Sequence, residues 1–280
     1  MQTRQQEQSS SPWTRFLVQW RAARRQRHLR GRSMLLAQRV QQIPAMIRTH
    51  WLAHAGEEIP GWRPSEADWP LVAGALMQFF DACRGAPDCA LPSRAADSLW
   101  HVWLARDPAG LASFQCQHFG REMPHVEGAD IDLEAGLARC WVQACRSEGL
   151  SPTGERLPLV FSADKLLATP TGWAYDRGPY QIVHRDLDGR GRPVGEFHTH
   201  QGLLLAGLAG MGLLHAHELE AQPQRKPAGD SGSNCGSSYL GSTCGTSSSG
   251  DCGAGSDAGS AGCSCSSGSS CGSSCGGGGN

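Results

Sequence analysis

Apolar side chains recur at helical spacing through most of the first 150 residues of this 280-residue chain. Trp13, Phe16, Leu17 and Trp20 repeat every three or four positions and predict a helix over residues 13–42. Similar stripes and end signals predict five more helices, over residues 44–56, 65–84, 93–107, 108–119 and 132–149. The pattern is that of a mainly α protein.

Capping residues mark the ends of several of these helices. Ser65, with Asp68 three residues on, is a variant of the capping box, and Ser93 is placed to cap the helix that follows it. Pro108 interrupts that helix, because its ring removes a hydrogen-bond donor. Gly120 is expected to end the next helix in the left-handed conformation that glycine accepts.

The pattern changes after residue 150. Residues 157–161 are apolar but interrupted by a proline, which favours an extended arm. Residues 180–184 and 194–198 flank the turn-forming run 188–191, which predicts a β-hairpin. A glycine-rich helix is expected over residues 203–220. The predicted fold is a single helical domain with one small β-hairpin.

The two ends of the chain have compositions that do not build a core. Residues 1–32 carry eight Arg and one Glu, and residues 229–280 contain 17 Ser, 16 Gly and 7 Cys. Fixing a backbone costs about 1–2 kcal/mol per residue, which such a tail does not recover by apolar burial. We therefore predict four parts: a basic, partly helical segment (1–32), a helical domain (33–175), a hairpin with a glycine-rich helix (176–228) and a disordered tail (229–280).

The basic N-terminal helix has two interpretations. Its Trp face can dock on the body of the protein, or the helix can lie on an anionic membrane surface. Because the apolar stripe stops after Trp20, we expect docking. The longest weakly polar run, residues 202–214, is too short to span a bilayer, and no signal-peptide or nucleic-acid-binding pattern is visible. A cytoplasmic location is expected, and thiols rather than disulfides at Cys83, Cys89, Cys116, Cys140 and Cys145.

Asp97 and His101 form the first candidate site. Four positions apart on one predicted helix, they share a face. A carboxylate on one imidazole nitrogen leaves the other nitrogen free for a metal or a proton. His125 can approach them if the two helices form a hairpin, with His118 and Cys116 as nearby alternatives. Three interpretations stay open: a polar cluster that locks the hairpin, a metal site, and a general acid–base pair.

Residues 93–101 read Ser-Arg-Ala-Ala-Asp-Ser-Leu-Trp-His, and Phe114, Phe119, Gly120 and His125 follow. This pattern resembles the bacterial glycine-rich domain-containing proteins, which carry Ser-Arg-x-x-Asp-x-x-Trp-His, Phe-Cys, Phe-Gly and His-His-x-Pro elements and a Gly/Cys-rich C-terminus. The resemblance covers residues 76–175 and the tail, and it implies no established reaction. Gln115 replaces the cysteine of that family and Pro124 its first histidine, which weakens a four-ligand metal site. The site positions that carry over are Asp97, Trp100, His101 and His125.

The second candidate is the run Glu196-Phe-His198-Thr-His200. Alternate residues of a strand face the same way, and a His-x-His pair is a common metal chelate. The alternative is a solvent-facing hairpin surface. His50 and His54, one helical turn apart, lack an acidic partner of the metalloprotease kind and are expected at the surface or the edge of the core.

The sequence favours a soluble binding or assembly module with an unidentified protein partner, built on Asp97, Trp100, His101 and His125. The first alternative is a metal-dependent hydrolase with zinc or iron at one of two pairs, His101 with His125 or His198 with His200. The second is a function of the cysteine-rich tail, either in metal handling or as the substrate of a peptide modification. Whether the protein is an enzyme stays open at this point.

Overall fold

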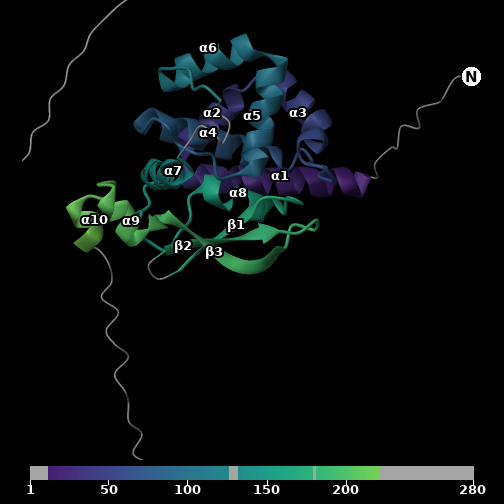
Figure 1. Ribbon diagram of the computed structural model, residues 1–280. Coiled ribbons are helices and arrows are strands. Elements are labelled where there is room, and N and C mark those ends of the chain that lie inside the picture. The colour runs from purple at the N-terminus through teal and green to yellow at the C-terminus, as the bar shows by residue number, and fades with distance from the viewer. Residues whose placement is uncertain (1–11, 126–131, 179–180, 221–280) are drawn as a thin grey trace, which may run out of the picture. The chain divides into compact units, whose positions relative to one another are not determined.

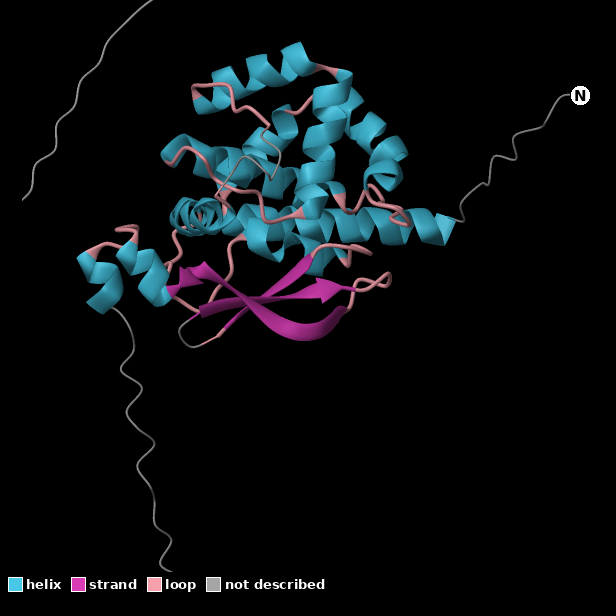
Figure 2. Cartoon of the chain, in the orientation of Figure 1, coloured by secondary structure: helices cyan, strands magenta, loops and turns pink. Residues whose placement is uncertain are grey.

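The computed structural model describes residues 12–125, 132–178 and 181–220, which form a layer of helices over a three-stranded antiparallel sheet (Figures 1 and 2). The described helices are α1 (Pro12–Arg32), α2 (Met34–Gln42), α3 (Ala45–Glu58), α4 (Trp69–Gly85), α5 (Arg94–Arg106), α6 (Pro108–Phe119), α7 (Leu133–Ser147), α8 (Leu159–Leu167), α9 (Leu205–Gly210) and α10 (Ala216–Glu220). The strands are β1 (Trp173–Arg177), β2 (Gln181–Leu187) and β3 (Pro193–Leu204). The predicted mainly α fold is confirmed. The predicted disordered tail, 229–280, lies outside the described residues.

Helix α4 is the centre of the helical layer. Fourteen of its 17 residues are buried, and it packs against α1, α2, α5, α7 and α8. Such all-round burial requires an apolar helix, and Leu76, Met77 and Phe80 are fully enclosed. One continuous core runs from Leu29 on α1 to Leu208 on α9, so the helices and the sheet share their apolar interior.

The sheet has the order β1-β2-β3, with both pairs antiparallel. The predicted hairpin is its β2–β3 half, in which His184 lies opposite His198. Strand β1 was not predicted, and it pairs with β2 at the edge of the sheet. Helix α8 contacts β1 and α7 contacts β3, so helices cover one face of the sheet (Figure 2).

Three predicted segments differ from the structure. The helix expected over residues 13–42 is broken at Ser33, whose hydroxyl accepts a hydrogen bond from the backbone of Leu36 and caps α2. The extended arm expected over residues 157–161 is wrong, because Pro158 immediately precedes α8 and suits a helix start. The glycine-rich helix expected over residues 203–220 is also wrong: β3 continues to Leu204, and two short helices follow.

The expectation that the Trp face of α1 docks on the body is wrong as well. Trp13, Phe16, Leu17 and Trp20 are all exposed. The thiol prediction is confirmed for the five cysteines of the described residues, which are free: Cys83, Cys89, Cys116, Cys140 and Cys145.

Candidate metal centre

Helix α5 carries the first two residues of the site. Ser93 begins the helix as predicted, since its hydroxyl accepts a hydrogen bond from the backbone N–H of Ala96 at 3.2 Å. The apolar face of α5 is buried against the core through Leu99 and Trp103. Asp97 and His101 lie on a more exposed part of the helix surface, one turn apart.

A buried carboxylate anchors the start of α5. Asp164 on α8 is 2 % exposed, and its oxygens accept hydrogen bonds from the Ser93 hydroxyl at 2.7 Å and from the backbone N–H groups of Arg94 at 3.0 Å and Ala95 at 3.1 Å. Burial raises the pKa of Asp164, and these hydrogen bonds act in the opposite direction. The sequence analysis missed this residue, because it lies about 70 positions from the helix that it caps.

His125 reaches α5 because the chain reverses after α6. Gly120 ends α6 at φ 81°, the left-handed conformation that the sequence predicted. Two residues then fix the return: Met123 is buried, and its N–H donates to the side chain of Gln115 at 3.1 Å. The imidazole of His125 packs against the ring of Trp100 in an edge-on arrangement, with centroids 4.5 Å apart.

Asp97, His101 and His125 bring three ligand atoms together, here called the triad. The Nε2 of His125 lies 3.1 Å from Oδ1 of Asp97 and 3.0 Å from Nε2 of His101, and the third separation, Asp97 Oδ1 to His101 Nε2, is 3.7 Å. Asp97, His101 and His125 could hold one metal ion together, because their ligand atoms lie this close to one another. The spacing therefore suits a single shared metal ion whose remaining coordination positions would be free of protein ligands. The predicted approach of His125 to Asp97 and His101 is present.

Glu58 completes the arrangement, and the sequence analysis missed it. It is the last residue of α3, and its Oε2 lies 2.8 Å from Nδ1 of His101. A proton on Nδ1 then points to Glu58 and leaves the Nε2 lone pair directed at the triad. Nothing in the sequence pairs these residues, because they are 43 positions apart and meet only through the packing of α3 on α5.

The triad is open to solvent on one side. The side chains of His101 and Asp97 are 37 % and 29 % exposed, and His125 is 16 % exposed. Trp100 is buried against Phe79 and Phe80 and forms the wall behind His125 rather than a ligand. Water or a small molecule can therefore approach the exposed side of the three ligand atoms.

The second predicted pair, His198 and His200, lies in a different cluster on the sheet. The ring of His184 stacks on that of His200, with centroids 4.7 Å apart and planes inclined by 14°, and lies 5.6 Å from that of His198. Nδ1 of His200 lies 2.9 Å from Oε1 of Glu134, whose Oε2 accepts the N–H of Gly202. Within the described residues, the only set of three or more side chains whose ligand atoms converge is the triad.

His184 is the buried member of the sheet cluster and was not predicted. It is 9 % exposed, and its Nδ1 has no hydrogen-bond partner among the described residues. Burial, followed by the neighbouring His200 and His198, lowers its pKa to about 4. Burial alone would raise the pKa of Glu134, but its hydrogen bonds with the Gly202 N–H and His200 outweigh burial and lower it.

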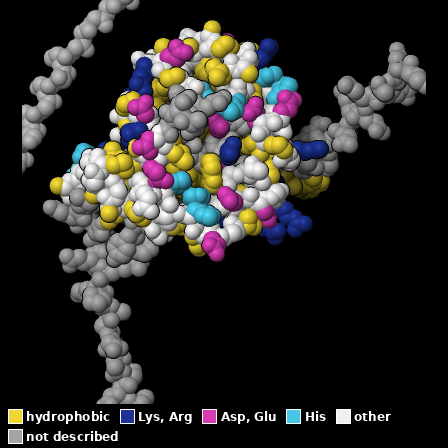
Figure 3. All heavy atoms as spheres, in the orientation of Figure 1, with side chains coloured by type: hydrophobic (Ala, Val, Ile, Leu, Met, Phe, Trp, Pro, Cys, Tyr) yellow, Lys and Arg dark blue, Asp and Glu magenta, His cyan; other side chains and the backbone are white. Residues whose placement is uncertain are grey.

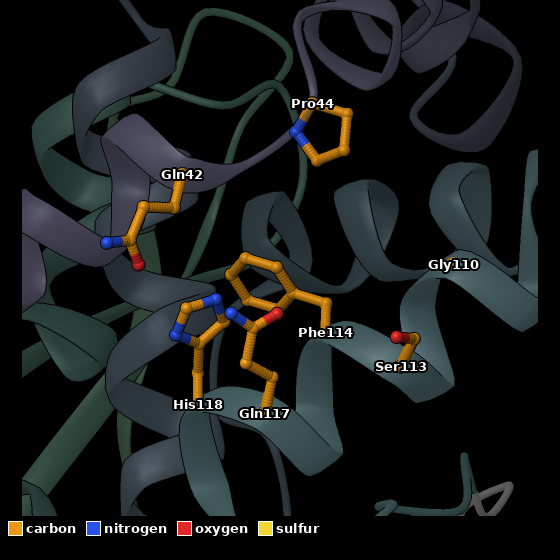
Figure 4. Close-up of a pocket in the computed structure, with 7 residues that line it drawn as sticks. All are labelled: Gln42, Pro44, Gly110, Ser113, Phe114, Gln117 and His118. Atoms are coloured by element: carbon orange, nitrogen blue, oxygen red, sulfur yellow. The ribbon is translucent and has the colours of Figure 1, made fainter.

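The remaining candidates do not join the triad. His118 lines a separate pocket of about 380 Å³ together with Phe114 and Gln117, facing Gln42 and Pro44 (Figure 4). Cys116 is exposed on α6. The rings of His50 and His54 lie 4.1 Å apart on α3, and Nδ1 of His54 lies 3.1 Å from a Glu57 oxygen. On the face drawn in Figure 3, histidines are exposed in separate places, with carboxylates near them.

Comparison with known proteins identifies one family. A model of the UCP032817-like family matches residues 37–191, which is more than half of the chain and includes Glu58 and the triad. The chain belongs to the UCP032817-like family. No curated protein and no solved structure matches it. Among the helices that the structure describes, none has the length and apolar character needed to cross a bilayer. The resemblance to glycine-rich domain-containing proteins stays a prediction.

Proposed function

We propose that this protein binds a divalent metal ion through Asp97, His101 and His125. The observation that carries the proposal is the convergence of two imidazole nitrogens and one carboxylate oxygen within 3.7 Å of one another. Two imidazoles with one carboxylate are a ligand set that suits zinc and iron(II). The proposal does not need the cysteine and the histidine that the glycine-rich domain-containing proteins carry where this chain has Gln115 and Pro124, because three protein ligands are sufficient.

The position of Glu58 fits the metal interpretation. A carboxylate that accepts the second N–H of a metal-binding histidine fixes its tautomer and raises its basicity. His101 has this arrangement, with Glu58 on Nδ1 and the triad on Nε2. A helix-locking cluster would also use the Glu58 contact, because it joins α3 to α5, so what favours a metal is the direction of the second His101 nitrogen toward Asp97 and His125.

A site of this kind serves metal-dependent hydrolysis. Catalytic zinc sites keep three protein ligands and leave a position for water or substrate, and the metal lowers the pKa of the bound water. The exposed side of the triad provides such a position. An assembly module built on the same residues is the competing proposal, and it predicts that the three side chains hold one another without a metal.

The test is metal binding by the full chain and by near-isosteric variants. Metal-free protein is titrated with zinc, and with iron(II) under anaerobic conditions, and bound metal is measured by mass spectrometry after gel filtration. The variants are Asp97→Asn, His101→Gln and His125→Gln. His118→Gln is the matched control, because His118 lies outside the triad. Thiols of residues 229–280 are common to all five proteins, so any zinc that they bind cancels in the comparison.

The expected result is one ion more per chain in the wild type and the His118→Gln control than in each triad variant. Equal metal content in all five proteins would overturn the proposal. If the Asp97→Asn variant then also melts at a lower temperature than the wild type, the triad is a polar cluster that locks the helices.

A further inference from the structure

The first two turns of α1 expose a stripe of large apolar side chains, here called the apolar stripe. Trp13 is 76 % exposed, Phe16 57 %, Leu17 48 % and Trp20 48 %. Four such residues in adjacent positions form a contiguous patch, and patches of this kind mark interaction sites in soluble proteins. In Figure 1 the beginning of α1 projects beyond the other helices, so no other described element covers it.

The apolar stripe points away from the body of the protein. Successive residues of a helix are rotated by about 100°, which places the stripe nearly opposite the line through Ala22, Arg25 and Leu29. That line is the inner face: Leu29 is fully buried, and Arg25 forms an ion pair with Asp68 of the body. The stripe therefore cannot turn inward while the second half of α1 keeps its packing.

Arginines continue the outward side of α1 beyond the apolar stripe. Arg24 and Arg27 lie on the same side as Trp20, one and two turns further on, and Arg21 and Arg30 flank them. All four are exposed, and none forms an ion pair with the described carboxylates. Helix α1 contains no Asp or Glu. Its outer face is thus apolar over two turns and cationic over the next three.

We propose that α1 docks this face on an anionic lipid surface. Aromatic and aliphatic side chains enter the boundary between headgroups and acyl chains, and arginines bind the lipid phosphates. At the edge of the molecule where α1 begins, Figure 3 shows hydrophobic and basic side chains next to each other. The helix lies on the membrane and does not cross it, consistent with the absence of a sufficiently apolar described helix.

Two other occupants fit the face less well. A nucleic acid would neutralise the arginines but would leave Leu17 and most of the apolar stripe in water. A second copy of the chain would cover the stripe but would bring two acid-free, arginine-rich helices together, which like-charge repulsion opposes. A lipid bilayer with anionic headgroups satisfies both halves of the face at once.

The experiment is co-sedimentation of the full chain with vesicles of phosphatidylcholine alone or with a third of phosphatidylglycerol. One variant removes most of the stripe, through Trp13→Gln, Phe16→Gln and Trp20→Gln. A second removes charge, through Arg24→Gln and Arg27→Gln. The matched controls are Phe197→Gln and Arg190→Gln, which change exposed side chains on or next to β3. All variants should melt with the wild type, because they alter exposed positions.

We expect the wild type to bind the anionic vesicles at least tenfold more tightly than the neutral ones, with binding that weakens as salt is added. The affinity of the charge variant for the anionic vesicles should be about 25-fold lower than that of the wild type, at about fivefold for each arginine. The affinity of the stripe variant should be at least tenfold lower. Both controls should bind like the wild type.

Three outcomes would overturn the proposal. Equal binding to neutral and anionic vesicles would contradict the role of the arginines. Unchanged binding of the stripe variant would show that the arginines alone attract the vesicles. Such nonspecific charge attraction would equally bind a nucleic acid. Failure to bind any vesicle, with a wild-type dimer in sedimentation velocity that the stripe variant lacks, would assign the face to a second copy of the chain.

Discussion

Replacing Asp164 tests whether a single buried carboxylate positions the helix that carries the triad. In Asp164→Ala, the Ser93 hydroxyl and the backbone N–H groups of Arg94 and Ala95 lose their acceptor. Water does not replace it readily, because Asp164 and Ser93 are almost completely enclosed. The first turn of α5 would then contain buried donors without partners.

The magnitude follows from the number of stranded donors. An unsatisfied buried donor costs about 1–3 kcal/mol, and the Ser93 hydroxyl can turn toward another acceptor whereas the two backbone N–H groups cannot. The expected loss is therefore about 3–5 kcal/mol, which is a large part of the 5–15 kcal/mol typical of a folded domain. Asp164→Asn keeps one acceptor oxygen but directs an amide N–H₂ group at other donors, so we expect an intermediate loss.

The assay is urea unfolding followed by circular dichroism, with zinc affinity measured on the same proteins. At a typical slope of about 2–3 kcal/mol per molar urea, the Asp164→Ala midpoint should fall by about 1–2.5 M. Asp186→Ala, which removes an exposed carboxylate from β2, is the control and should unfold like the wild type. A midpoint for Asp164→Ala within 0.2 M of the wild type, taken as roughly the precision of such a measurement, would refute the reasoning.

Three further predictions concern the two histidine clusters. Glu58→Gln should lower the zinc affinity of the triad about 10–100-fold, as measured by titration calorimetry, and should leave the stability of the metal-free protein nearly unchanged. An unchanged zinc affinity would show that Glu58 does not support the metal site. Asp97→Ala should destabilise the metal-free protein by at most about 1 kcal/mol in urea unfolding, because water can replace the lost acceptor of His125 on the exposed side of the triad; a loss above about 2 kcal/mol would favour the helix-locking cluster. His184 has a folded pKa of about 4, below its usual 6.5, so its contribution is fully present above pH 6.5 and is lost as the pH falls toward 4, by up to about 3 kcal/mol. His184→Phe should abolish this part of the pH dependence, and parallel stability curves for the two proteins between pH 7 and 4 would contradict the assignment.

The parts of the fold that the sequence predicted depend on local signals. Ser93, Pro108 and Gly120 act on their own backbone, so the helices that they delimit could be placed from sequence. The start of α8 could not, because proline there was read as a break. The backbone N–H groups of its first two residues donate hydrogen bonds to the side chains of Glu148 and Gln78. These acceptors lie 11 and 82 positions away in the sequence.

The candidate site also contains residues that local sequence signals predicted and residues that they could not predict. The Asp97 and His101 pair is a spacing on one helix and can be read from sequence, and His125 was within reach of a hairpin. Glu58 and Asp164 could not be found, because each joins α5 from a distant element through packing alone. On the sheet, the spacing of His198 and His200 was visible, but their stacking with His184 depends on the register of β2 and β3.

Ring geometry explains why the triad and the sheet cluster should serve different purposes. A metal binds an imidazole nitrogen in the plane of the ring, so several histidines share an ion only when their ring planes converge on one point. Across neighbouring strands the rings of His184 and His200 lie almost parallel, inclined by 14°, and among the described residues the ligand atoms of this cluster do not converge as those of the triad do. His101 and His125 come from a helix and from the segment after α6, their rings are inclined by 60°, and their Nε2 atoms meet at 3.0 Å. Histidines therefore favour a shared ion at the triad. At the sheet they form a stack that requires at least one uncharged imidazole, and protonation in acid would destabilise that stack.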